Sequence, residues 1–182
     1  MIFKETIIEG AWSIDPTPHL DERGRFMRAW CRREFADHSI QFDPVQANMS
    51  ESLKAGTIRG LHYQIPPHAE AKLMRCTRGS VYDVLVDLRP DSPTLGRWFG
   101  LELSATNARM LFVPPLCAHG YQTLSQDAET YYLTSAYFAP AAVRGLRFDD
   151  PGLMIQWPLL VSDVSEQDQR WPTFSEMIQG EQ

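Results

Sequence analysis

The sequence has 182 residues, of which 43% are apolar, and a formal net charge of −6. The length predicts one domain, or at most two small ones; we expect a single domain over residues 1–182, with enough apolar residues for a buried core. The acidic balance argues against general nucleic-acid binding, although a local basic cluster in a cleft can still hold an anionic small ligand.

Short strand-like runs separated by turn residues predominate along the chain. In chain order, the predicted strands cover residues 1–8, 72–77, 80–88, 98–103, 109–114, 118–124, 130–138 and 145–150. Helix is sparse: one short helix is predicted at 32–39, and another in the polar tail that begins at Ser162. Regularly spaced strands with turn signals between them are typical of an all-β antiparallel sandwich or barrel.

The predicted strand at 80–88 has an unusual distribution of charge. By strict alternation, Asp83 and Asp87 share one face with Val81 and Leu85. This face is either half solvated or lines a polar cavity. From this strand alone, a solvated sheet face is favoured.

No segment is predicted to cross a membrane or to direct export. The most apolar stretch, 81–86, is short and contains Asp83. The N-terminal MIFKETIIEG is too short and too acidic for a signal peptide. Cys31, Cys76 and Cys117 are odd in number and widely spaced, so we expect no disulfide framework and a cytoplasmic location.

The histidines do not form a predicted metal site. The sequence contains no HxH pair, and Pro66 and Pro67 separate His62 from His68, so one strand cannot present both. His62 lies near Arg59 and Lys72 in sequence. An imidazole can take a proton near neutral pH, and a lysine can stabilise an oxyanion. Solvated surface charge is the competing interpretation for Arg59 and Lys72.

Aromatic residues are concentrated in the predicted strand at 130–138. Alternation places Tyr132 on the face opposite to Tyr131 and Tyr137. One face therefore packs in the core, and a phenol on the other can meet a ligand. His119 follows a Pro-Pro turn at the start of a strand, a position that often borders a cavity. These features predict a polar cavity in an all-β protein but do not specify a reaction.

An ordered series of segments resembles the dTDP-4-dehydrorhamnose 3,5-epimerase family over almost the whole chain. The matching segments are residues 21–26, 46–50, 56–64, 72–98, 101–107, 112–125, 128–140, 145–151, 155–158 and 165–168. The resemblance implies a jelly-roll (cupin) β-sandwich with a few short peripheral helices. It also implies a homodimer that binds a nucleotide sugar and works without a metal or other cofactor.

The resemblance implies four catalytic roles. His62 resembles the general base that removes the C3 and C5 protons, and Asp168 resembles the carboxylate that pairs with it. Tyr132 resembles the acid on the opposite face. Lys72 resembles the group that stabilises the enolate oxygen at C4.

The resemblance also implies a set of substrate contacts. Arg23, Arg59 and His119 resemble contacts to the diphosphate and the reacting region. Gln46 and Asn48 resemble contacts to the nucleotide base, and Tyr137 resembles an aromatic beside the substrate. Strand alternation places Arg59 and His62 on opposite faces, so both reach one site only if Gly60 marks a β-bulge.

Four positions depart from the family pattern: Arg28, Leu133, Val143 and Gln167. The nucleotide, the sugar and the number of carbons inverted are therefore left open. The alternatives are a single-centre epimerase, a 3,4-ketoisomerase of another sugar nucleotide, and a non-catalytic cupin that binds a sugar nucleotide.

Overall fold

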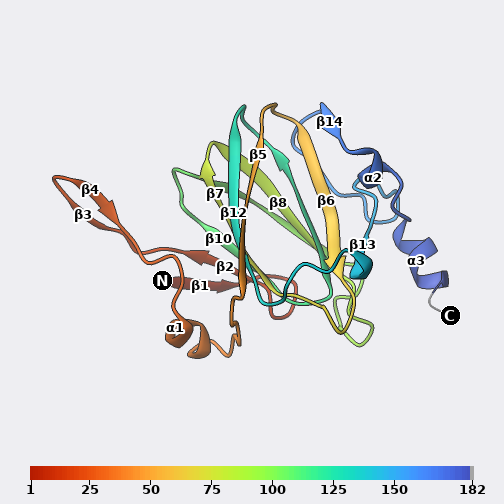
Figure 1. The fold of residues 1–182 in the computed structure, drawn as a ribbon, viewed down its shortest axis with the longest axis horizontal. Coiled ribbons are helices and arrows are strands. Elements are labelled where there is room, and N and C mark those ends of the chain that lie inside the picture. The colour runs from red at the N-terminus through yellow and green to blue at the C-terminus, as the bar shows by residue number, and fades with distance from the viewer. Residues whose placement is uncertain (181–182) are drawn as a thin grey trace.

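The computed structural model describes residues 1–180, which form two facing β-sheets and a separate hairpin (Figure 1). The first sheet has the order β1 (Ile2–Glu5), β2 (Trp12–Asp15), β10 (Met110–Val113), β7 (Lys72–Arg78), β12 (Ala128–Thr134), β5 (Gln46–Ser52). The second has the order β13 (Val143–Gly145), β6 (Thr57–Gln64), β11 (Cys117–Thr123), β8 (Ser80–Asp87), β9 (Trp98–Ser104), with β14 (Asp163–Val164) paired to β6. All of these neighbouring strands pair antiparallel except β14 and β6, which are parallel. The predicted all-β fold class is confirmed.

Helices are short and peripheral, as predicted. They are α1 (Arg32–Ala36), α2 (Glu166–Gln169), α3 (Phe174–Gly180) and the 3-10 turn η1 (Pro140–Ala142). The hairpin of β3 (His19–Asp21) and β4 (Gly24–Phe26) projects away from the sandwich (Figure 1). Within residues 1–180, no helix is long and apolar enough to cross a membrane.

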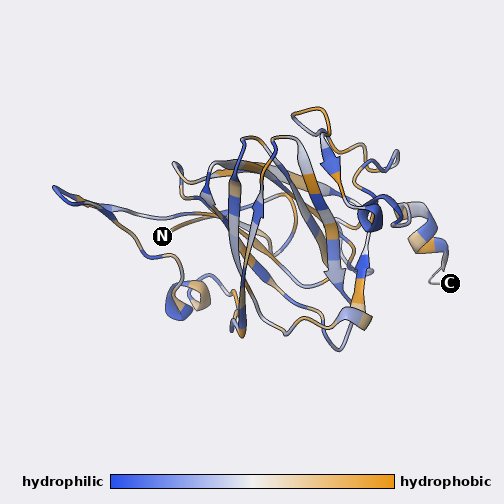
Figure 2. Ribbon diagram, turned by 45° about the horizontal axis from the view of Figure 1, so that its top comes forward, coloured by the Kyte–Doolittle hydropathy of each residue, from blue (hydrophilic) through white to orange (hydrophobic). Residues whose placement is uncertain are grey.

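Apolar side chains form three clusters. One lies between the sheets and includes Met74, Leu85, Leu111 and Tyr121. A second covers the outer face of the second sheet, where the segment after β13 packs on β6 and β8. A third places Phe35 of α1 against β2 and β10. Figure 2 shows the alternation of hydrophilic and hydrophobic residues along the strands that produces these faces.

Several elements differ from the sequence prediction. The strands predicted in chain order did not include β2, β5, β6, β14 or the β3–β4 hairpin, and the predicted strand at 145–150 is irregular after Gly145. β5 was missed because its side chains are mostly small or polar, which strand propensity disfavours. It becomes a strand through continuous pairing with β12, from Gln46–Thr134 to Ser52–Ala128.

The solvated face favoured for β8 is wrong. Asp83 and Asp87 are both fully buried, on the face that points between the two sheets. Asp83 pairs with His119, and Asp87 accepts hydrogen bonds from Arg89, Ser92 and Thr94. Side-chain partners available only in the folded chain make burial of these carboxylates tolerable.

β6 contains the bulge predicted at Gly60. His62 pairs with His119, but Arg59 pairs with Tyr121, so β6 has one residue more than β11 between these two pairs. Gly60 has φ +131°, and a Cβ there would lie 2.5 Å from the Cα of Gly120. The extra residue resets the alternation, so Arg59 and His62 both line the cavity between the sheets.

Candidate active site

A cavity of about 530 Å³ opens between the two sheets. Its walls come from β5, β7 and β12 of the first sheet, β6 and β11 of the second, and the segment that contains β14 and α2. The inward side chains of β5 are polar, namely Gln46, Asn48 and Ser50, whereas Ala47 and Met49 are exposed on the other face. Two distant parts of the chain, β6 and the C-terminal segment, therefore meet at one polar cavity.

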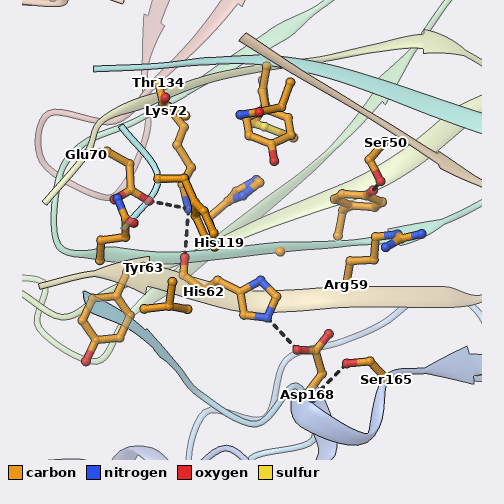
Figure 3. Close-up of a pocket in the computed structure, with 18 of the residues that line it drawn as sticks. Ser50, Arg59, His62, Tyr63, Glu70, Lys72, His119, Thr134, Ser165 and Asp168 are labelled. Atoms are coloured by element: carbon orange, nitrogen blue, oxygen red, sulfur yellow. Dashed lines mark hydrogen bonds and ion pairs between the residues drawn. The ribbon is translucent and has the colours of Figure 1, made fainter. Parts of the chain in front are cut away.

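His62 and Asp168 form a close pair in the cavity wall (Figure 3). The Nε2 atom of His62 lies 2.6 Å from Oδ1 of Asp168. Asp168 is held in turn by the N–H of Gly60 and the indole N–H of Trp171, which donate to its two oxygens. Since an ionised carboxylate only accepts hydrogen bonds, Nε2 carries the proton and Nδ1 of the neutral ring is the basic nitrogen.

The environment of Asp168 keeps it ionised. Burial disfavours the charged form, but hydrogen bonds from His62, Gly60 and Ser165 outweigh burial, so the pKa of Asp168 is lower than usual. Ser165 caps α2 and accepts the N–H of Asp168, which fixes this residue in the first turn of the helix. A short helix thus delivers an oriented carboxylate to His62.

Lys72 crosses from the first sheet towards the second. Its Nζ donates to the carbonyl oxygen of His62 at 3.0 Å and lies 3.1 Å from Oε1 of Glu70. Both side chains are almost completely buried in the cavity wall. A buried ammonium in this position can stabilise negative charge that develops on a bound ligand.

Tyr132 lines the cavity from β12, whereas Tyr131 does not. The predicted opposition of these two faces is confirmed. Burial, together with the nearby Tyr121 and Glu70, raises the pKa of the Tyr132 phenol, although Arg59 acts in the opposite sense. The phenol therefore stays protonated at neutral pH and is available as a proton donor.

His119 forms a second close pair, with Nε2 2.6 Å from Oδ1 of Asp83. Its side chain is 7% exposed, compared with 38% for His62. The structure thus brings His62, Lys72, Tyr132, Asp168, His119, Arg59, Gln46 and Asn48 to one cavity.

Two predicted contacts lie outside this cavity. Arg23 is at the tip of the β3–β4 hairpin, exposed and paired with Asp21. Tyr137 is 69% exposed and follows β12. Both remain predictions, and within one chain neither side chain lines the cavity.

The four departures from the family pattern fall into two groups. Val143 and Gln167 line the cavity. Leu133 packs with the third apolar cluster, and Arg28 pairs with Glu34 on the surface. Val143 and Gln167 are therefore the two departures placed to affect ligand choice directly.

Sequence reasoning missed Glu70, Tyr121 and Gln64, which also line the cavity. Gln64 lies two residues after His62 on β6, and Tyr121 lies two residues after His119 on β11, so strand alternation from these two histidines could have found both. Glu70 lies just before β7 and had no sequence signal of its own. Among residues 1–180, no three His, Cys, Asp or Glu side chains gather as metal ligands.

Comparison with known proteins identifies close relatives. The sequence profile described as dTDP-4-dehydrorhamnose 3,5-epimerase matches residues 5–176. A dTDP-4-dehydrorhamnose 3,5-epimerase of Sinorhizobium fredii is 41% identical over 182 residues, covering 97% of this chain and 91% of the relative.

Solved structures of related enzymes are similar to this chain over almost its whole length. The rmlC epimerase of Mycobacterium tuberculosis has a TM-score of 0.94 at 36% identity, with 100% of this chain and 92% of that one covered. ChmJ of Streptomyces bikiniensis, a 3'-monoepimerase solved with dTDP-quinovose, has a TM-score of 0.90 at 33% identity, with 97% and 89% covered.

Proposed function

The chain belongs to the dTDP-4-dehydrorhamnose 3,5-epimerase family, and we propose that it works through His62, Asp168, Lys72 and Tyr132. It is an isomerase that epimerises a 4-keto-6-deoxyhexose nucleotide at C3, C5 or both. The observation that carries the residue assignment is the arrangement of a basic imidazole and a protonated phenol on two facing sheets around one cavity.

His62 is the proposed general base. The C4 ketone acidifies the hydrogens at C3 and C5, because the carbanion delocalises into an enolate. Asp168 holds Nε2 at 2.6 Å, so Nδ1 takes the proton from carbon. The ionised Asp168 then stabilises the imidazolium that forms, as in other His–carboxylate pairs.

Lys72 is the proposed partner of the enolate oxygen. Its ammonium is held by Glu70 and by the carbonyl of His62, so it is positioned before the substrate binds. Negative charge at O4 is greater in the enolate than in the ketone. A fixed cation therefore lowers the barrier by binding the transition state more tightly than the substrate.

Tyr132 is the proposed acid. It lies on the first sheet and His62 on the second, so a sugar ring between the sheets meets the base on one face and the phenol on the other. Protonation of the enolate by Tyr132 adds hydrogen to the face opposite the one that lost it, which inverts the carbon.

The remaining cavity residues are proposed to bind the nucleotide sugar. Arg59 and His119 contact the diphosphate or the region around the reacting carbons, while Gln46 and Asn48 contact the base. The bound dTDP-quinovose of ChmJ supports a nucleotide-sugar ligand. Arg23 and Tyr137 are proposed to join these contacts in the assembled enzyme.

We further propose that residues 1–182 are a single domain that assembles as a cytoplasmic homodimer. The β3–β4 hairpin supports the dimer, because it extends from the sandwich with Leu20 77% and Phe26 74% exposed (Figure 1). Such residues are expected to be covered by a partner. If the hairpin lies across a second copy, Arg23 at its tip approaches the partner's cavity.

The site is proposed to need no metal. His62 and His119 are each engaged by a carboxylate at 2.6 Å, and both pairs act as oriented acid–base groups without a third ligand. Stabilisation of the enolate is assigned to Lys72 instead.

A 3-epimerase is the second candidate. The similarity to the 3'-monoepimerase ChmJ supports it. Val143 and Gln167, which line the cavity, are the departures that bear on this choice. Incubation with dTDP-4-dehydro-6-deoxyglucose in deuterated water separates the two, because a 3-epimerase exchanges C3 alone.

The same assay tests the base. His62→Asn keeps a polar side chain of similar size but removes the basic nitrogen, so deuterium exchange should be lost at both carbons. His68→Asn is the matched control, since His68 is exposed and does not line the cavity, and exchange should be unaffected. Normal exchange in a folded His62→Asn protein would remove His62 from the mechanism.

A further inference from the structure

Glu70 is a buried carboxylate with no substrate role in the mechanism above. It lines the cavity and is 8% exposed. Its Oε1 atom lies 3.1 Å from Nζ of Lys72, whereas Oε2 is buried without a hydrogen-bond partner. Figure 3 shows Glu70 beside Lys72, on the same side of the cavity and near His62.

A buried carboxylate oxygen without a donor is costly, and such groups in folded proteins usually find a partner. Glu70 lines the cavity, so a ligand there can supply the missing donor when the carboxylate turns its buried Oε2 towards the ligand. The donor must be a neutral hydroxyl or a cation, because a phosphate would be repelled. A sugar hydroxyl fits this requirement and the nucleotide diphosphate does not.

The position of Lys72 identifies which hydroxyl. Lys72 is proposed to hold O4, and Glu70 shares the same ammonium. A 4-keto-6-deoxyhexose is asymmetric about its ketone: C3 carries a hydroxyl, whereas C5 carries the ring oxygen and a methyl group. The only hydroxyl adjacent to O4 is therefore the one on C3.

Resting on the proposed function, we infer that Oε2 of Glu70 accepts a hydrogen bond from the C3 hydroxyl of the sugar. Lys72 then binds the ketone oxygen, and Glu70 binds the hydroxyl on the neighbouring carbon. This contact orients the sugar ring with C3 towards Glu70 and C5 away from it, and so favours reaction at C3.

Glu70→Gln tests the contact with little change of shape. The amide oxygen is expected to face Lys72, which leaves an NH₂ group where Oε2 stood. A hydrogen-bond acceptor is thereby replaced by a donor. Exchange at C3 in deuterated water should fall about tenfold or more relative to exchange at C5, the typical effect of losing a hydrogen bond to a charged group.

Two controls accompany this measurement. Glu102→Gln makes the same chemical change at an exposed position on β9, and it should leave both rates as in the unaltered enzyme. A substrate analogue that lacks the C3 hydroxyl removes the partner instead of the residue. With that analogue, Glu70→Gln and the unaltered enzyme should exchange C5 at the same rate, and the unaltered enzyme should bind the analogue about tenfold more weakly than the substrate.

The outcomes are distinct. Equal loss at C3 and C5, or a Glu70→Gln defect that persists with the analogue, would mean that Glu70 acts only through Lys72 and would overturn the inference. Normal binding of the analogue by the unaltered enzyme would overturn it without any variant. Absence of exchange at both carbons in the unaltered enzyme would instead sink the proposed function.

Discussion

Two histidines of the cavity have the same carboxylate geometry but different exposure. His62 and His119 each place Nε2 2.6 Å from a buried aspartate oxygen. The His62 side chain is 38% exposed and that of His119 is 7% exposed. Proton transfer from carbon requires the ring to reach the substrate directly, so the more open His62 suits the base and the enclosed His119 suits a fixed contact.

In Tyr132→Phe, cleavage of the C–H bond should continue, whereas inversion of the carbon should largely fail. The ring and its packing remain, and only the hydroxyl is lost. His62 should still remove the proton while Lys72 holds the enolate, so exchange in deuterated water continues, with deuterium returning from the His62 side or from the solvent. Formation of inverted product should fall about a hundredfold or more, as is typical for a lost proton donor.

Tyr131→Phe is the matched control for this prediction. Tyr131 is the neighbouring residue on β12 but does not line the cavity. Product formation should be unchanged in this variant. If Tyr132→Phe also forms product at the normal rate, Tyr132 is only a packing residue.

The bulge in β6 places both His62 and Arg59 on the face of the strand that lines the cavity. In Gly60→Ala, the new Cβ would meet the Cα of Gly120 at 2.5 Å and the carbonyl of His119 at 2.9 Å, at φ +131°. We expect a loss of roughly 2–4 kcal/mol in the free energy of unfolding, from overpacking and left-handed strain. Epimerase activity should fall with it, because His62 moves relative to Asp168.

Gly24→Ala provides the comparison for the bulge. Gly24 has a similar φ of +128°, but nothing lies within 4 Å of its Cβ position. Urea unfolding should show a loss of roughly 1 kcal/mol, from strain alone. Equal losses for the two variants would mean that the close approach of β6 and β11 contributes little.

The connection after β8 depends on one buried carboxylate. Burial of Asp87 opposes ionisation, but hydrogen bonds from Arg89, Ser92 and Thr94 prevail and lower its pKa to about 2. The ordinary value is 3.8, so this stabilisation is complete above about pH 4 and is lost as the pH falls through about 2.

Asp87→Asn should therefore lower the free energy of unfolding by about 2 kcal/mol at neutral pH. The difference in free energy of unfolding between this variant and the unaltered protein should become smaller as the pH falls from 4 towards 2. Urea unfolding across this pH range measures it. Asp149→Asn, which removes an exposed partner of Arg147, should have a much smaller effect at every pH. A constant difference for Asp87→Asn would contradict the assigned pKa.

For the whole molecule, the prediction is a homodimer that depends on the hairpin. Light scattering at micromolar concentration should give twice the mass of one chain. Leu20→Ser with Phe26→Ser should shift the protein towards monomer without unfolding the sandwich, because both side chains are exposed and outside the three core clusters. A monomer in the unaltered protein would refute the assembly.

The fold class and one face of the cavity wall were predictable from the sequence. Alternation predicted that Tyr132 and Tyr131 lie on opposite faces, and turn residues with short apolar runs predicted an all-β fold. These features depend on the local geometry of a strand, which neighbouring residues determine. The resemblance to a known family added the pairing of His62 with Asp168, two residues 106 positions apart.

Other features were decided only by the tertiary structure. Burial of Asp83 and Asp87 depends on partners from other segments and from the following turn, so the local pattern favoured a solvated face. β5 is a strand because β12 pairs with it, despite its polar composition. The unpartnered oxygen of Glu70 has no local signal at all, because burial and hydrogen-bond satisfaction are set by residues that meet only when the two sheets close on each other.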